Sequence, residues 1–364
     1  MSTTPVSLPS AEEEIWRYSR IAELDLGAYS TGSLRTETIG ADALRVTDAI
    51  TGIALTTDVD VFARLNSEHV ASHPQDVVCL HIPSGKVFET PIEVVHTVHE
   101  SGLIAFPRLV IDAGQDSEAT VIERFISADG ITSVVCPVLE VRAAQSARIT
   151  YVAINQLGIN TWKIAHQQSV GYRDSNTRLF TVALGGDYAR VRTEARLVEQ
   201  GASTQQVALY FAGGSQMHDF RTLQVHAAPK TSSDLLFKGA VRDVARSVYT
   251  GLIHIKENAR GSQAYQTNRN LTLSEGAWAE SVPNLEIETN DVKCSHASTV
   301  GPIDEDQRFY LESRGVPPSV AERLVVMGFF NEVIDRLPSF TGVDALRAEV
   351  ARKLLAEHIE IGHS

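Results

Sequence analysis

From His81 onward the chain is a long succession of short strand-like runs, and this succession limits the possible folds more than any other feature. The runs are rich in Val, Ile, Thr and aromatic residues, Gly, Asn, Asp and Ser separate them, and no helical period occurs among them. They are Lys86–Val98, Leu109–Asp112, Ala119–Ile126, Ser133–Val141, Ala147–Ile154, Thr161–Tyr172, Arg178–Leu184, Ala189–Val198, Thr204–Phe211, Thr222–His226, Ser233–Gly239, Ser247–Ile255 and Asn270–Ser274. This pattern predicts a large, mainly β body, and a sandwich, a pair of barrels and a solenoid all fit it.

Small residues recur where strands begin, as the tight corners of stacked β-coils require. Examples are Ser117-Glu118-Ala119, Gln145-Ser146-Ala147, Asp187-Tyr188-Ala189 and Gly201-Ala202-Ser203. The steps between them are about 30, 40 and 14 residues, which is too uneven for a clear repeat and also fits ordinary hairpins. The pattern therefore favours a solenoid only slightly.

The N-terminal part differs from this β body. Residues 1–80 form a mixed segment, in which Ala11–Leu26 is predicted as a short acidic helical start and Thr47–Val59 as an apolar alternation. The helical start contains Trp16 and Tyr18. We expect three parts in the chain: this segment, a β body over 81–301 and a helical domain over 302–364.

The C-terminal part has helical composition. Asp304–Ser313 and Val316–Arg336 are predicted as a helix pair, with Gly315 closing the first helix and the prolines at 317 and 318 opening the second. Asp344–Ile359 is predicted as a third, amphipathic helix. A small helical domain is therefore expected to follow the β body.

Charge and hydropathy exclude several classes of partner. The 32 basic and 45 acidic residues give a net charge of -13, which repels phosphate backbones and anionic lipids, so nucleic acid and membranes are poor partners. Neither a leader nor a run of about 18 apolar residues occurs, so a cytoplasmic protein is expected. The odd number of widely spaced cysteines, at Cys79, Cys136 and Cys294, suits reduced thiols.

The sequence has no motif for nucleotide or hydrolytic chemistry. Gly185-Gly186-Asp187 and Gly213-Gly214-Ser215 lack the following helix and lysine of a phosphate-binding loop, so they are predicted to be turns. No GxSxG elbow occurs and no carboxylate pair stands out. We expect this chain to bind no nucleotide and to have no enzymatic activity.

One stretch, Asn284–Gly301, concentrates the residues whose chemistry suits a metal. After a turn at Asn290-Asp291, Cys294 and His296 fall on the same side of an extended run, with their Cα atoms about 6.6 Å apart. They suit one soft-metal centre, but they are only two of the four ligands that a closed site usually needs. The alternative is that Cys294 is a small buried hydrophobe and His296 a hydrogen-bonded residue at a coil end.

Four other histidines are weaker candidates. His96 and His99 face opposite sides of a strand and do not easily grip one ion. For His218 and His226, which flank an extended run, a satisfied polar position near a corner is the preferred interpretation. A free-standing β-solenoid or cupin-like metalloenzyme is the rival hypothesis, and it would bind one metal per chain through His96, His99, His218 or His226.

Four motifs, in the right order, resemble the SufB/SufD family of iron-sulfur cluster assembly proteins. They are EEEIWRYSR at 12–20, TSSDLLFKG at 231–239, AYQTNRNLTLS at 264–274 and PNLEIETNDVKCSHASTVGPIDEDQRFYLESRG at 283–315. The resemblance is densest over Met217–Leu337 and much thinner before Asp112.

This resemblance implies a right-handed parallel β-helix flanked by N-terminal and C-terminal helical segments. It also implies a scaffold, because in the family SufB and SufD pair through their β-helices, each holds one SufC ATPase subunit through its C-terminal helices, and the cluster forms near the SufB–SufD junction. The expected partners are a SufB-like paralogue and a SufC-like ATPase, with a homodimer as the alternative in isolation.

Two departures from SufB favour SufD. Ala277 stands where SufB usually has a cysteine before the PxLE-type element, and His296-Ala297-Ser298-Thr299 stands in place of HEAT. The SufD histidine at the cluster-forming junction would correspond to His296, with Cys294 beside it. The resemblance thus implies a nascent iron-sulfur cluster that is transient and shared with the partner, with His296 as a metal ligand and Cys294 as a second candidate.

The C-terminal helices carry more large apolar side chains than two short helices bury between themselves, so some should face a partner. We expect the region from Tyr310 to Phe330 to contact the SufC-like ATPase, as a helix in a groove. The candidate contact residues are Phe309, Tyr310, Arg314, Leu324, Met327, Phe329 and Phe330.

Overall fold

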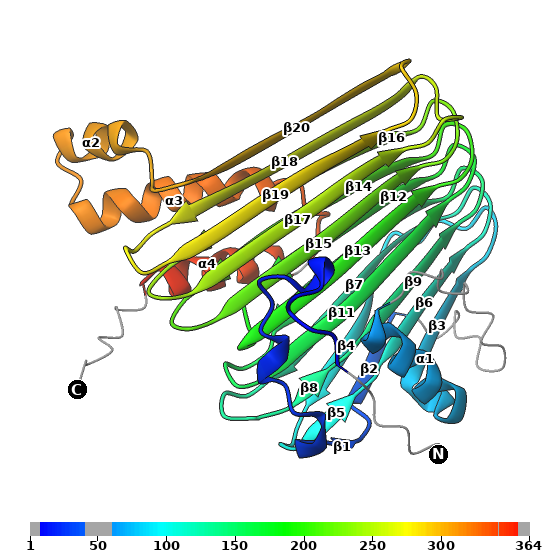
Figure 1. Cartoon of the computed structure of the whole chain (residues 1–364), viewed down its shortest axis with the longest axis horizontal. Coiled ribbons are helices and arrows are strands. Elements are labelled where there is room, and N and C mark those ends of the chain that lie inside the picture. The colour runs from blue at the N-terminus through cyan, green and yellow to red at the C-terminus, as the bar shows by residue number, and fades with distance from the viewer. Residues whose placement is uncertain (1–7, 41–59, 341, 356–364) are drawn as a thin grey trace.

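The chain is mainly β and forms a β-solenoid of about 8 turns with helices at both ends (Figure 1). The computed structural model describes residues 8–40, 60–340 and 342–355. Successive long strands alternate between two sheets, whose inward side chains meet in a common core. The predicted solenoid is confirmed.

The two sheets are built almost entirely from parallel pairs. The first sheet contains β1 (Ser30–Thr31), β3 (Val77–Ile82), β5 (Leu103–Ala105), β6 (Arg108–Ala113), β8 (Val134–Val135), β9 (Val138–Ala143), β11 (Trp162–Gly171), β13 (Tyr188–Leu197), β15 (Met217–His226), β17 (Arg246–Ile255) and β19 (Trp278–Ile287). The second contains β2 (Arg35–Ile39), β4 (Ile92–Val98), β7 (Glu118–Ser127), β10 (Arg148–Gln156), β12 (Asn176–Ala183), β14 (Ser203–Ala212), β16 (Ser232–Val241), β18 (Ser262–Thr272) and β20 (Val292–Gly301). Among the described strands only β2 and β4 pair antiparallel.

One corner of the solenoid repeats about every 30 residues. One or two residues before successive strands of the second sheet, the backbone has a positive φ of 54° to 78°, at Asp116, Ser146, Asp174, Gly201, Lys230 and Gly261. At each corner this residue donates its N–H to a carbonyl of the next coil, as Asp116 does to Gln145 at 3.0 Å. One of the predicted corners, at Asp187, does not belong to this series, because it precedes a strand of the first sheet. Counting it together with corners of the second sheet made the predicted steps uneven.

The inward-facing side chains change character along the solenoid. In the N-terminal coils they are aliphatic, as at Leu80 and Val121. In the C-terminal coils aromatic rings fill the core, and the hydroxyl of Tyr210 donates to the amide oxygen of Asn270 and accepts from the amide of Asn268. The C-terminal interior is therefore the more polar half.

Helices and the N-terminal segment cover the outer faces of both sheets (Figure 1). Val326 and Phe330 pack on the second sheet against Val207 and Leu209. Trp16 packs on the outer face of the first sheet.

The N-terminal segment is not one helix over Ala11–Leu26, as predicted, but three single-turn 3-10 helices. These are η1 (Glu14–Trp16), η2 (Ile21–Glu23) and η3 (Leu26–Ala28). The guanidinium groups of Arg190 and Arg221 donate to the carbonyl oxygens of Ile15 and Arg17. A continuous helix would need these carbonyl groups for its own hydrogen bonds, so binding to the sheet replaces it.

A helix that the sequence pattern missed follows this segment. This helix, α1 (Val61–Ser72), buries Phe62 and begins after Asp60, whose carboxylate accepts from the N–H of Ala63 at 3.0 Å. A 3-10 turn, η4 (Pro74–Asp76), connects it to β3. The predicted alternation at Thr47–Val59 lies outside the described residues.

The three predicted C-terminal helices are confirmed as α2 (Glu305–Ser313), α3 (Pro318–Ile334) and α4 (Val343–Leu355). Asp304 caps α2 by accepting from the N–H groups of Asp306 and Gln307. The predicted end of the last helix, Ile359, lies beyond the described residues. None of the helices in the described ranges has the length and apolarity to span a membrane.

Several strand ends differ from the predicted ones. The run Ser133–Val141 is divided into β8 and β9 at Pro137, since proline cannot donate to the ladder. The run Asn270–Ser274 is the last part of β18, and Lys86–Val98 becomes a strand only from Ile92. The strands β1, β2, β3 and β5 were not predicted.

The Tyr210 ring provides a test of core packing. A Cβ at Gly239 would lie 1.8 Å from a ring carbon of Tyr210, so Gly239→Ala should lower the free energy of unfolding by at least about 3 kcal/mol. Gly301→Ala is the control, because no atom lies within 4 Å of that Cβ, and its effect should stay within about 0.5 kcal/mol. Urea unfolding measures both, and equal midpoints would refute the packing.

Buried His226 should make stability depend on pH. Its ring nitrogens bind the hydroxyls of Thr231 and Ser233, both at 2.8 Å, and burial lowers its pKa from 6.5 to about 4. The unfolded chain therefore binds more protons between these values, so the contribution of neutral His226 is complete above pH 6.5 and is lost as the pH falls to 4. The loss amounts to about 3 kcal/mol.

His226→Gln should flatten this decline in urea unfolding measured from pH 7.5 to 4. Burial shifts the pKa of His218 the same way, to about 4, and this histidine is present in both proteins. The difference between the two pH profiles therefore isolates His226. His99→Gln removes an exposed imidazole as the control, and parallel profiles for wild type and His226→Gln would contradict the prediction.

Candidate functional site

The last coil, formed by β19 and β20, is the open end of the solenoid (Figure 1). Within the described residues β19 pairs only with β17 and β20 only with β18, so each leaves one edge without a strand. The hydroxyl of Ser298 on β20 donates to that of Ser281 on β19 at 2.7 Å and links the two strands. Such an edge presents unpaired backbone N–H and C=O groups to another chain.

Cys294 and His296 lie on this edge strand. The strand is extended over both residues, so they share the face that is directed toward the solenoid axis, and they stand opposite Ala264 and Gln266 of β18. Cys294 is half-buried against Ile253 and its neighbours in the core, and burial raises the pKa of its thiol. His296 is exposed, because within the described part of the chain no further coil covers it.

The site holds too few donors to enclose a metal. Cys136 is buried beneath the N-terminal segment and Cys79 lies on β3, in the first coils. Apart from Cys294, no thiol of the described residues belongs to the last coil. One neutral thiol and one imidazole are therefore the donors that this face presents.

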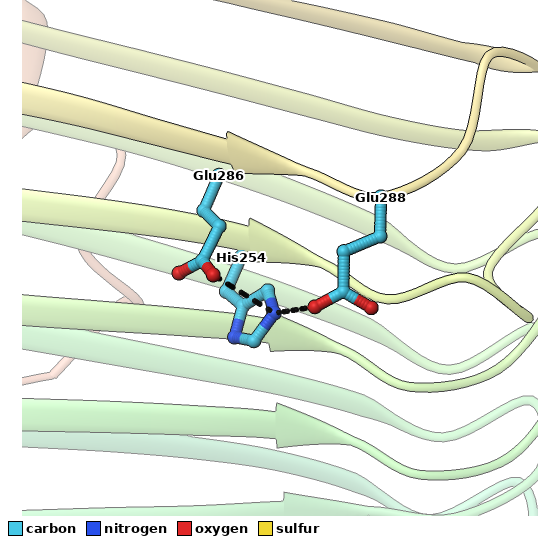
Figure 2. A group of neighbouring side chains, drawn as sticks. All are labelled: His254, Glu286 and Glu288. Atoms are coloured by element: carbon cyan, nitrogen blue, oxygen red, sulfur yellow. Dashed lines mark hydrogen bonds and ion pairs between the residues drawn. The ribbon is translucent and has the colours of Figure 1, made fainter.

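A second cluster of donors joins the outer faces of β17 and the last coil, as Figure 2 shows. The Nε2 atom of His254 on β17 lies 2.7 Å from Glu288 and 3.9 Å from Glu286, and ligand atoms of the three residues lie within 4.8 Å of one another. The sequence pattern does not predict this cluster, because only the strand register that pairs His254 with Glu286 brings the three side chains together.

Hydrogen bonds account for this cluster. The hydrogen bond from His254 lowers the pKa of Glu288, and the N–H of Glu257 donates to the second oxygen of that carboxylate at 3.2 Å. Both carboxylates are exposed. The arrangement is therefore an imidazole between two carboxylates on the surface.

The four histidines of the metalloenzyme hypothesis do not come together. His96 is buried, and its ring nitrogens bind the Thr36 hydroxyl at 2.9 Å and a Glu123 carboxylate oxygen at 3.0 Å. His226 is bound by hydroxyls on both sides, His218 is buried, and His99 is exposed after β4. Within the described chain, His254, Glu286 and Glu288 form the only group of three or more donors with metal-binding spacing.

A groove of about 900 Å³ lies where α2 and α3 meet the second sheet. Leu324 and Phe329 of α3 and Tyr310 of α2 line its helical side, and Lys238 and Arg269 line its sheet side. Lys238 holds α3 in place by donating to the carbonyl oxygen of Phe329 at 3.1 Å and by an ion pair with Glu332. The helix α2 has no buried residue.

The predicted partner-contact residues divide into two groups. Phe309, Tyr310 and Leu324 are 71%, 58% and 48% exposed, which is unusual for large apolar side chains. Phe330 is completely buried against the second sheet, so it is excluded from the partner-facing set. Met327 and Phe329 are half-buried against the same core. Arg314 is polar, and its guanidinium lies 5.3 Å from the Tyr310 ring.

Comparison with known proteins agrees with this geometry. Residues 96–329 match the family described as SUF system FeS cluster assembly, SufBD core domain. An iron-sulfur cluster assembly SufBD family protein of Mycobacterium tuberculosis is 32% identical over 360 residues, which cover 91% of this chain and 85% of that protein.

Two proteins named iron-sulfur cluster assembly protein SufD are also similar. The Bacillus subtilis protein is 33% identical over 71% of this chain and 60% of its own length, and the Escherichia coli protein is 27% identical over 80% and 69%. The matched core includes the solenoid coils from β7 to β20 and most of the helical groove. The chain therefore belongs to the SufBD family of iron-sulfur cluster assembly proteins.

Proposed function

We propose that the chain is a SufD-like, non-catalytic scaffold of a cytoplasmic iron-sulfur cluster assembly complex. It pairs with a SufB-like paralogue through the open end of the solenoid and with a SufC-like ATPase through its C-terminal helices. The observation that carries the proposal is the incomplete donor set of Cys294 and His296 on a strand whose outer edge pairs with no other described strand.

The chemistry of the two donors supports a shared site. A thiolate is the form that ligates iron, and the raised pKa of the half-buried Cys294 keeps its thiol neutral at physiological pH. The exposed imidazole of His296 offers a nitrogen ligand, and unlike Cys294 it needs no thiol deprotonation to do so. The nascent cluster, which is cargo, is then held only when a second chain adds ligands across the junction.

The backbone of the last coil supports pairing with another solenoid. Strands β19 and β20 are 10 residues long each and carry free edges on both sheets at the same end of the molecule. A SufB-like chain with a similar last coil would extend both sheets across the junction. In isolation a second copy of this chain would use the same edges.

The groove beside α2 and α3 supports the ATPase contact. Exposed Tyr310 and Leu324 offer apolar anchors, and Lys238, Arg269 and Asp304 provide charges at its border. An amphipathic element of the partner fits such a groove. ATP is bound by that partner, and movement of α2 and α3 is transmitted to β20, which precedes α2 directly.

His296 is the first test. His296→Ala should reduce cluster formation by the reconstituted three-component complex at least about tenfold, because it removes a ligand at the junction. Ser295→Ala changes the neighbouring residue on the opposite face and should leave assembly unchanged. Cluster absorbance and transfer to an apo-acceptor are the measurements, and undiminished assembly by His296→Ala would refute the role of His296.

Leu324 is the second test. Leu324→Glu places a charge in the groove and should weaken binding of the ATPase subunit at least about tenfold in calorimetry. Ser319→Glu adds the same charge at an exposed position in the first turn of α3, outside the groove lining, and should leave affinity unchanged. Equal affinities for the two variants would move the ATPase contact away from this groove.

A further inference from the structure

Gln266, on β18, has a buried amide without a hydrogen-bond partner. Its side chain is 2% exposed, and neither Nε2 nor Oε1 has a hydrogen-bond partner among the described residues. An unpaired buried polar group costs about 1–3 kcal/mol, so its presence requires a reason.

The position of Gln266 connects it to the candidate site. It is the direct ladder neighbour of His296 on β20, and both side chains point to the axis of the solenoid. Parallel neighbours lie about 4.8 Å apart, so the Gln266 side chain lies one strand inward from the imidazole. A Cβ at Gly251 would lie 2.5 Å from the Nε2 of Gln266 and 2.3 Å from the hydroxyl of Tyr249, so the glycine leaves the space that these groups occupy.

A metal-binding histidine needs a hydrogen-bond acceptor for its second ring nitrogen, and the amide of Gln266 has an acceptor oxygen that is unused within the described chain. Such an imidazole binds the metal with one nitrogen and donates its other N–H to an oxygen, which fixes the tautomer and the ring orientation. His296 makes no hydrogen bond or ion pair within the residues that the structure describes. On its own face Cys294 packs on apolar groups and Ser298 already donates to Ser281, whereas the amide oxygen of Gln266, the ladder neighbour of His296, is an acceptor that is not in use among the described residues.

We propose that Gln266 is a positioning residue for His296. When the cluster is bound, Oε1 of Gln266 accepts the imidazole N–H, and the other ring nitrogen is held toward iron. This inference rests on the proposed role of His296 as a ligand.

The chain contains a matched control in the same column of side chains. Gln206 on β14 is separated from Gln266 only by Leu235, is fully buried, and also has both amide atoms without a partner among the described residues. It lies too far inward to reach His296. Replacing either glutamine with leucine removes an unpaired amide and should leave the stability equal or higher.

The experiment compares Gln266→Leu, Gln206→Leu and Gln266→Glu in the reconstituted three-component complex. Gln266→Leu should lower cluster formation about tenfold without lowering Tm, and pulsed EPR of the reduced cluster should show a changed imidazole-nitrogen coupling. Gln266→Glu keeps an acceptor oxygen and should restore assembly to within about threefold of wild type. Gln206→Leu should alter neither assembly nor the EPR coupling. If Gln266→Leu impairs folding, Gln266→Met serves as the second apolar variant.

The outcomes separate this inference from the proposed function. If His296→Ala abolishes assembly while Gln266→Leu and Gln266→Met leave the rate and the nitrogen coupling unchanged, the positioning role is refuted and the ligand role stands. An equal loss in Gln206→Leu would also refute it, because the effect would then come from the core. If His296→Ala assembles normally, both the ligand role and the positioning role fail.

Discussion

In-register parallel stacking is the interaction on which the rest of the structure depends. Each coil satisfies the backbone hydrogen bonds of the coil before it, from the strand ladders to the corner where Asp116 donates to Gln145 and Ser146 to Arg173. Stacking also aligns side chains into columns, so that Gln266 comes to lie beside His296. Its unavoidable consequence is a last coil on which no further coil of the described residues stacks, and that coil carries the candidate site.

The coverings of the two sheets show how the solenoid limits its exposed surface. The outer face of the second sheet carries large apolar side chains, which α3 and α4 bury. On the first sheet Arg190 and Arg221 instead hold the N-terminal segment by its carbonyl groups, with the Arg190 guanidinium 3.9 Å from the Trp16 ring. Both coverings bind across several coils, and the exposed His296 of the last coil and the exposed Leu324 of the helical groove lie outside these buried contacts.

Much of the fold was predictable because its signals are local. Strand composition from His81 to Ser274 identified the β body, and Gly315 marked the end of α2. The predictions failed where a distant contact decides the local structure. The N-terminal segment has helical composition, yet Arg190 and Arg221 take the carbonyl groups that a helix would use. The repeat was obscured because Asp174 and Lys230 occupy corner positions with a positive φ that glycine favours.

The sequence by itself determined the family, through long motifs in a fixed order, and it placed Cys294 and His296 on one face of a strand, because side chains alternate with period two. Only the tertiary structure decided which residues surround them. Gln266, Gly251 and His296 come from different strands, and Phe330 and Leu324 differ in burial although both lie on α3. The physical reason is that period and composition decide which face of a strand or helix a side chain occupies. The residues that lie beside that side chain depend on stacking between residues about 30 positions apart.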